Sequence, residues 1–243
     1  MIIDTHCHID LYKKPELLLT ECEKEGIIVF AMTNLPSHFE MGQPFFKKTK
    51  NIRLSLGLHP LYAEKHKSEY PIFLRNLDNT SYIGEVGLDF SKEGINTKEL
   101  QINTFIKVLE VTSDKKKILS IHSKRAEKEV LELLLKHNIK NAIFHWYSGQ
   151  TSLINKIIDA GFFFSINPSM TNSTNGQSII SKIPINRILT ESDGPFVQFE
   201  QRTIHPKDIG VTIEYISSSR NITISEVENQ IQSNLNELIN RIR

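Results

Sequence analysis

The chain has 243 residues, of which 39% are hydrophobic and 23% charged, a composition typical of a globular protein with a sizeable core and unlike that of a disordered chain. Its 29 basic and 28 acidic residues leave a formal net charge of +1, which excludes strong long-range attraction of polyanions and restricts any nucleic-acid contact to a local surface. No secretory signal pattern and no apolar run of roughly 20 residues is visible, so we expect a cytoplasmic protein.

Eight short apolar runs, many of them β-branched, recur along the chain and predict strands. They lie at 2–3, 27–32, 52–56, 82–83, 118–121, 141–144, 162–166 and 187–190. Helical spacing fills stretches between most of them, at 15–24, 97–112, 126–137 and 153–160. Alternating strands and helices indicate parallel pairing, and the chain length fits one (β/α)8 TIM barrel, an α/β fold, as a single domain over residues 1–243.

Two later segments complete the prediction. Residues 167–178 are polar and contain both Pro and Gly, which predicts a loop and a candidate mobile lid. After Thr223, apolar residues recur at helical intervals behind Ser225. This pattern predicts a closing C-terminal helix with Ser225 as its N-cap.

A side chain suited to chemistry follows each predicted strand. In chain order these residues are His6 with His8, Asn34, His59, Glu85, His122, His145, Asn167 and Asp193. The carboxyl ends of the strands of such a barrel meet at one face, where the active site forms. We therefore expect side chains that are tens of residues apart in the sequence to lie close together.

The first pair is informative by its spacing alone. In an extended strand, residues i and i+2 point to the same side, so His6 and His8 can bind one ion. Cys7 then points the other way and is expected to be a small buried residue. Cys7 and Cys22 are both expected to be reduced. The four remaining histidines are interpreted as structural: His38, His66, His137 and His205.

The carboxylates extend this pattern to a metal centre. Imidazole suits zinc, manganese or iron, and carboxylates add hard oxygen ligands. Taken singly, Glu85 could stabilise a helix N-terminus and Asp193 could cap a turn. Their shared position after predicted strands favours a metal site instead. A Glu85 that bridged two ions would suit the hydrolysis of phosphate esters.

Six segments in order resemble motifs of the TatD-type metal-dependent deoxyribonucleases: "DTHCHID", "GLHP", "YIGEVGLDF", "IHSKRA", "FHWYSG" and "ILTESDGP". The resemblance covers nearly the whole chain. It implies a TIM barrel that hydrolyses phosphodiesters at DNA ends, commonly from the 3′ side, with two divalent ions (Mg, Mn or Zn). Stretches such as "FFFSINPSM" are similar to the QatD branch of anti-phage operons, which implies a defence role beside other Qat proteins.

The same resemblance implies roles for particular residues. One ion would be held by His6, His8, Glu85 and Asp193. The second ion would be held by Glu85, His122 and His145. Asp193 would also be the general base for the attacking water, and His59 would lie beside the scissile phosphate.

Three nearby side chains are candidates for binding the rest of the substrate. Lys124 and Arg125 follow His122 and could contact flanking phosphates, although they could equally be solvated charges at a helix start. Trp146 could stack on a terminal base, and core packing is the alternative for Trp146 and its neighbour Tyr147. With little net charge, we expect trimming of short or single-stranded DNA ends with modest affinity.

The chain departs from the family pattern at two places. Phe90 follows "GLD" where a tyrosine is common, and "RTIHPKD" stands where an Arg-Asn-Glu-Pro element is usual. Two alternatives remain at this point. One is an amidohydrolase-like enzyme acting on a small C–N or lactone substrate, although such sites commonly bridge their ions with a modified lysine rather than with a residue like Glu85. The other is a non-catalytic barrel subunit of a defence complex.

Overall fold

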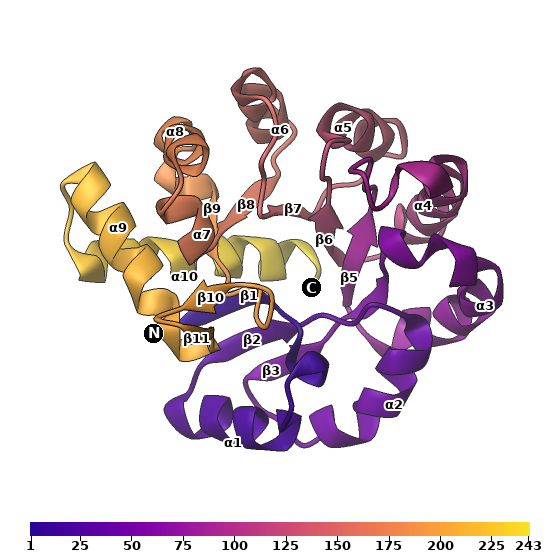
Figure 1. The fold of residues 1–243 in the computed structure, drawn as a ribbon, viewed down its shortest axis with the longest axis horizontal. Helices are drawn as coiled ribbons and strands as arrows, with labels where there is room; N and C mark the ends of the chain where they lie inside the picture. Colours follow the sequence, from indigo (N-terminus) through magenta and orange to yellow (C-terminus); the bar gives the residue numbers. More distant parts are fainter.

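Parallel strands form a closed barrel with helices around its outside in the computed structural model, which describes residues 1–243 (Figure 1). The barrel strands are β1 (Ile3–Cys7), β2 (Ile28–Ala31), β3 (Ile52–Leu54), β4 (Leu56–Leu58), β5 (Tyr82–Gly87), β6 (Ile118–His122), β7 (Ala142–His145), β8 (Phe163–Ile166) and β9 (Ile188–Thr190). They pair in sequence order within two sheets, β1 to β3 and β4 to β9. Since β3 and β4 are separated only by Ser55, the strands fill the eight positions of a (β/α)8 barrel.

The barrel closes between its first and last strands through side chains as well as backbone. The Thr5 hydroxyl donates to the carbonyl of Thr190 at 3.0 Å, and the Thr190 hydroxyl donates to the carbonyl of Ile3 at 2.5 Å. The Asp193 amide then donates to the carbonyl of His6 at 2.9 Å. Site residues from the first strand and from the segment after the last strand, His6 and Asp193, are therefore hydrogen-bonded to each other directly.

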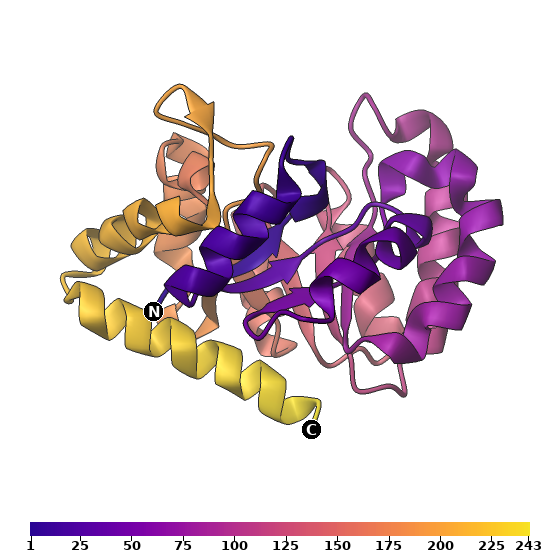
Figure 2. The same ribbon diagram turned by 90° about the horizontal axis from the view of Figure 1, so that it is seen from below.

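Ten helices surround or cap the barrel (Figure 1): α1 (Pro15–Glu25), α2 (Pro36–Phe46), α3 (His66–Asn76), α4 (Lys98–Thr112), α5 (Glu127–Lys136), α6 (Ile154–Asp159), α7 (Pro168–Thr171), α8 (Thr174–Lys182), α9 (Gly210–Arg220) and α10 (Ile224–Arg241). A small hairpin of β10 (Gln198–Phe199) and β11 (Arg202–Thr203) precedes α9. Figure 2 shows α10 crossing one end of the barrel. None of these helices has the combination of length and apolar character needed to cross a membrane.

The barrel strands are buried on both faces, as expected for parallel strands covered by helices. Every residue of β1, β4, β7, β8 and β9 is buried. Cys7 and Cys22 are free thiols with no exposed surface. The interpretation of Cys7 as a small buried residue is therefore confirmed.

The predicted loop and lid over residues 167–178 is wrong, because this segment contains α7 and most of α8. Its polar residues are helix caps: the Asn167 side chain accepts from the Met170 amide at 3.0 Å, and the Ser173 hydroxyl accepts from the Gly176 amide at 3.1 Å. Two successive caps therefore produced a composition that resembles a loop.

The cap of the C-terminal helix also differs from the prediction. Helix α10 begins at Ile224, so Ser225 lies inside its first turn. Thr223 is the N-cap: its hydroxyl accepts from the Glu226 amide at 3.2 Å, and the Glu226 carboxylate accepts from the Thr223 amide at 2.8 Å. This reciprocal pair is a capping box.

Candidate metal centre

Side chains from four strands and the loop after β9 converge at the carboxyl end of the barrel. They line a cavity of about 520 Å³ whose walls are Asn34, His59, Leu61, Tyr62, Glu85, Asp89, His122, Ser123, Lys124, His145, Trp146, Ser148, Asp193 and Phe196. His6 and His8 do not line it and have almost no exposed surface. The structure thus brings together all six predicted metal ligands.

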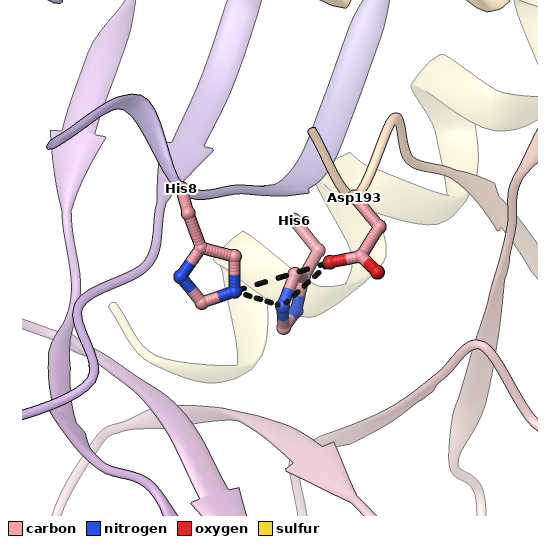
Figure 3. A group of neighbouring side chains, drawn as sticks. All are labelled: His6, His8 and Asp193. Atoms are coloured by element: carbon pink, nitrogen blue, oxygen red, sulfur yellow. Dashed lines mark hydrogen bonds and ion pairs between the residues drawn. The ribbon is translucent and has the colours of Figure 1, made fainter. Parts of the chain in front are cut away.

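The first group of ligands comes from the two ends of the barrel sequence (Figure 3). The Nε2 atoms of His6 and His8 are 3.2 Å apart. Asp193 Oδ1 lies 3.6 Å from Nε2 of His6 and 3.9 Å from Nε2 of His8. These three atoms point to one place, as the ligands of a single cation would.

Glu85 connects this group to a second one. Its Oε2 lies 3.5 Å from Nε2 of His6 and 3.2 Å from Nε2 of His8. Its Oε1 lies 2.5 Å from Nδ1 of His122 and 2.9 Å from Nε2 of His145. Each carboxylate oxygen therefore faces a different group of imidazoles, which is the geometry expected of a bridging ligand.

Local backbone structure explains why Glu85 can reach this position. The pairing of β5 with β6 shifts between Ile83 and Val86, as at a bulge that turns a side chain toward a site. At Gly84, an added Cβ would lie 2.6 Å from the Met32 sulfur and 2.9 Å from Ser120 Cβ. Only glycine fits before Glu85.

Polar residues behind the histidines set their orientation. Nδ1 of His6 lies 2.7 Å from the Ser120 hydroxyl, and Nε2 of His122 lies 2.9 Å from Asp89 Oδ2. When these ring nitrogens carry the proton, the opposite nitrogen of each ring presents its lone pair to the cluster. Metal-binding histidines are usually held in this way.

His59 differs from the other histidines of the cluster. Its Nδ1 accepts from the Leu61 amide at 3.1 Å, so the neutral ring carries its proton on Nε2, which lies 3.3 Å from Glu85 Oε1. The backbone carbonyl of His59 accepts a hydrogen bond from Nε2 of His66 at 3.0 Å. The potential ligand atoms of His59, Glu85 and His122 lie close enough together to bind one cation. In this tautomer, however, Nε2 of His59 carries a proton and acts as a hydrogen-bond donor.

Burial and the neighbouring charges perturb the titration of the site. Burial, together with the charge of His145, lowers the pKa of His6 well below its usual value and keeps the ring neutral. Burial alone would raise the pKa of Glu85, but the surrounding imidazoles, His59 first, hold it well below its usual value. Burial raises the pKa of Asp193 well above that of an ordinary carboxyl group.

The donor set fits divalent cations. The lining of the cavity contains three acidic side chains, Glu85, Asp89 and Asp193, and one lysine, Lys124. Neutral imidazoles and carboxylates together suit zinc, manganese and related ions. The side chains of Glu85 and Asp193 face histidines, so neither serves as a helix-terminus partner or a turn cap.

The predicted substrate-binding residues separate into two groups. His59, Lys124 and Trp146 line the cavity, whereas Arg125 is exposed and does not. Tyr147 is buried in the core, and its hydroxyl donates to the carbonyl of Gln150 at 2.7 Å. Core packing is therefore the correct interpretation for Tyr147.

Two buried carboxylates near the site were missed from the sequence. Asp89 orients His122, as described above. Glu191 has no exposed surface; it accepts from the Trp146 amide at 3.0 Å and from the Asn167 side chain at 2.9 Å. Both lie inside motifs already noted, "GLD" and "TESD", and an acidic residue beside a metal-ligand motif was the available signal.

Comparison with known proteins places these features in a family. The model of the family described as TatD related DNase matches residues 3–240. The human protein named deoxyribonuclease TATDN3 is 26% identical over 262 residues, covering 100% of this chain and 96% of that protein. A protein of Buchnera aphidicola named uncharacterized metal-dependent hydrolase BU355 is 28% identical over 263 residues, covering 98% and 99%.

A solved structure agrees with the architecture. The crystal structure of YJJV, a TatD homolog from Escherichia coli K12, superposes with a TM-score of 0.86 at 20% identity. The match covers 98% of each chain. This similarity supports the barrel fold.

Proposed function

Because the chain belongs to the TatD-related DNase family, we propose that it is a metal-dependent hydrolase that cleaves phosphodiester bonds in DNA. The observation that carries the proposal is the placement of Glu85, whose two carboxylate oxygens face separate groups of histidines. A carboxylate shared between two cations suits phosphate ester hydrolysis, in which charge builds up on several oxygens.

From the two ligand groups we infer which side chains would hold each cation. Two divalent ions, Mg, Mn or Zn, would when bound neutralise the charge that develops on the phosphate oxygens. The first would be held by His6, His8, Asp193 and Glu85. The second would be held by Glu85, His122 and His145. Ser120 and Asp89 keep the ring nitrogens of His6 and His122 correctly oriented.

Asp193 is the proposed general base. Asp193 lines the cavity, and burial raises the pKa of its carboxyl group well above the usual range. A carboxylate with a raised pKa is a stronger base, which favours removal of a proton from an attacking water near neutral pH. Glu85, whose pKa is held low, stays ionised as a ligand.

His59 is the proposed donor to the scissile phosphate. Because Nδ1 is occupied by the Leu61 amide, Nε2 carries the proton and points into the cluster. A neutral donor at this point can bond a phosphate oxygen without adding a negative charge.

We propose single-stranded 3′ ends as the substrate. Three aromatic side chains, Tyr62, Trp146 and Phe196, line the cavity, and Phe196 is 57% exposed. Exposed rings can stack on an unpaired terminal base, while Lys124 contacts a flanking phosphate. With one lysine in the lining, long duplex DNA has little to bind; the 3′ to 5′ direction follows the resemblance to the family.

The test is a nuclease assay with metal titration on 5′-labelled single-stranded DNA. We expect stepwise shortening from the 3′ end, and a loss of at least about 100-fold in rate for Asp193→Asn, the magnitude of general-base catalysis. Glu132→Gln, on the exposed face of α5, is the matched control and should keep full activity. Rapid nicking of closed circular duplex, or hydrolysis of amides or lactones without DNA cleavage, would contradict the proposal.

We also propose a cytoplasmic role in anti-phage defence beside Qat partner proteins. The support is the similarity of segments such as 162–170 to the QatD branch. The test compares phage plating on cells that carry the operon with wild-type protein or with Asp193→Asn. Protection should be lost with the variant. Full protection with Asp193→Asn would instead indicate a non-catalytic barrel subunit.

A further inference from the structure

A second cavity, of about 460 Å³, lies at the end of the barrel opposite the metal centre. Its walls include the residues just before β6 and β7 and the last turn of α10. Figure 2 shows α10 running across this end. Strand starts surround this cavity, whereas strand ends surround the metal centre, so the two sites are separated by the length of the barrel.

The lining of this cavity is strongly basic, although the whole chain carries a formal net charge of only +1. One acidic residue, Asp114, lines it together with five basic ones: Lys115, Lys116, Lys117, Lys140 and Arg241. Two further acids, Asp78 and Glu237, pair with Lys115 and Arg241 from outside the lining. Lys116 also donates to the terminal carboxyl oxygen of Arg243. Five positive charges against four negative ones still leave a local excess of one.

Part of this charge is fixed in place by the fold. Lys117 is buried, and its ammonium group donates to the carbonyls of Leu77 at 2.7 Å and Thr80 at 2.5 Å. Arg241 Nη1 donates to the carbonyl of Gly161 at 3.0 Å. The ammonium group of the exposed Lys140 has neither a hydrogen bond nor an ion pair. The cavity therefore combines positioned charges with a free one.

Asn141 adds an observation of a different kind. It is 7% exposed and lines the cavity, and its Oδ1 has no hydrogen-bond partner. Its Nδ2 donates to the carbonyl of Lys117 at 3.3 Å, which fixes the orientation of the amide. Buried acceptors without a donor are uncommon in folded proteins. Oδ1 has almost no accessible surface as it lies, so rotation of the Asn141 side chain toward the cavity would let a hydroxyl or amino group of a ligand supply the missing donor.

We propose that this cavity binds an organic phosphate of mononucleotide size. The lysines and Arg241 bind the phosphate, and a hydroxyl or amino group of the ligand donates to Asn141 Oδ1. The volume is in the range of small-molecule sites, roughly 300–1,000 Å³, and is larger than inorganic phosphate requires. The proposal does not depend on the activity at the other end of the barrel.

The test is isothermal titration calorimetry of the magnesium-loaded protein with three probes: deoxycytidine monophosphate, inorganic phosphate and deoxycytidine. The nucleotide should bind most tightly, phosphate more weakly, and the uncharged nucleoside not measurably. Equal affinity for phosphate and nucleotide would overturn the organic-phosphate proposal. If deoxycytidine bound as tightly as deoxycytidine monophosphate, the proposed role of the basic lining would be overturned.

Variants separate this site from the metal centre. Lys116→Glu with Lys140→Glu should weaken nucleotide binding by at least about tenfold, equivalent to about 1.4 kcal/mol. The matched control, Lys47→Glu with Lys48→Glu, makes the same charge change at exposed residues beyond α2 and should bind normally. A nucleotide bound only at the metal centre would keep full affinity in both double variants, which would exclude the second site.

Asn141→Asp provides an independent check with almost no change in shape. The new carboxylate would face the phosphate-binding lysines from inside the cavity, so nucleotide affinity should fall by at least about tenfold. Thermal denaturation identifies any loss of folding. A folded Asn141→Asp protein with unchanged affinity would overturn the assignment of Asn141 to the ligand.

Discussion

Five imidazole rings, which lie in or directly after strands β1, β4, β6 and β7, surround the Glu85 carboxylate. The ring nitrogen that carries the proton depends on the second hydrogen bond of each ring. The ring of His6 is held by Ser120, that of His122 by Asp89, and that of His59 by the Leu61 amide. With the proton on the nitrogen that faces Ser120 or Asp89, the first two rings direct a lone pair at the cluster, whereas the third directs a proton. At the residue scale, the chemistry of a histidine is thus decided by the atom behind it.

The first prediction concerns Asp89→Asn. The amide NH₂ would face the Nε2 proton of His122, and the repulsion would favour the tautomer with its proton on Nδ1, toward Glu85. We expect metal affinity to fall about 10–100-fold, as is typical when such a partner is lost. Calorimetric titration with Mn²⁺ measures this. Asp159→Asn, at the exposed end of α6, is the control; equal affinity in the two variants would contradict the role of Asp89.

The second prediction concerns pH. Burial alone would lower the pKa of His122 and His145. The charge of Glu85 and the hydrogen bonds to the carboxylates, Asp89 for His122 and Glu191 for His145, together outweigh burial, so the pKa of His122 is raised and that of His145 is raised well above its usual value. A cation must displace these protons. Metal affinity should therefore decrease as the pH falls, beginning above the ordinary histidine pKa of about 6.5. Mn²⁺ titrations across the range from about pH 6 to pH 8 test this, and pH-independent affinity would contradict it.

At the scale of elements, helix boundaries were the least predictable features. Helices α2 and α3 contain Pro44 and Pro71, and no helix was predicted for either. Proline interrupts a helical pattern in sequence, yet α2 is held by the buried residues Phe39 and Phe46. The packing of these apolar side chains thus outweighed the unfavourable effect of proline on the helix. Asn167 and Ser173 show the converse, since cap residues were mistaken for a loop.

The third prediction concerns the cap of α10. Thr223→Ala removes the hydroxyl that accepts from the Glu226 amide and should lower the free energy of unfolding by about 1 kcal/mol. Ser225→Ala is the control, because Ser225 lies within the first turn and its loss should change stability by less than about 0.5 kcal/mol. Urea denaturation measures both. A larger loss for Ser225→Ala than for Thr223→Ala would reverse the assignment of the cap.

At the scale of the whole molecule, the metal centre depends on closure of the barrel. His6 and Asp193 lie on opposite sides of the seam between β1 and the segment after β9, and the Asp193 amide donates to the His6 carbonyl. Asp4 contributes as well, since its carboxylate accepts from the amide of Ser192 at 3.0 Å. The seam that completes the fold therefore also assembles the first candidate cation site.

The fourth prediction concerns this seam. Thr190→Val keeps the shape of the side chain but removes the donor to the buried carbonyl of Ile3. An unsatisfied buried acceptor costs about 1–3 kcal/mol, so the free energy of unfolding should fall by that amount, and Mn²⁺ affinity should fall with it. Thr20→Val, on the exposed face of α1, is the control. Unchanged unfolding in Thr190→Val would show that the seam does not depend on this hydroxyl.

The sequence alone predicted the barrel class and, through its resemblance to a family, the six candidate metal ligands that the structure brings together. Both are local signals: apolar runs alternate with helical spacing, and a ligand-type side chain such as His122 follows each run. The family comparison is consistent with this fold.

Tertiary structure decided the rest, because it depends on contacts between residues far apart in the chain. The family resemblance implied that Glu85 is shared by two ions, but no neighbouring residue type shows which oxygen of Glu85 faces which histidines or where the proton lies on His59. The same is true of Asp89 behind His122, and of the basic cavity that unites Lys116 with Arg241. Spacing and composition describe what each segment can contribute, but only closure of the barrel fixes which atoms face one another.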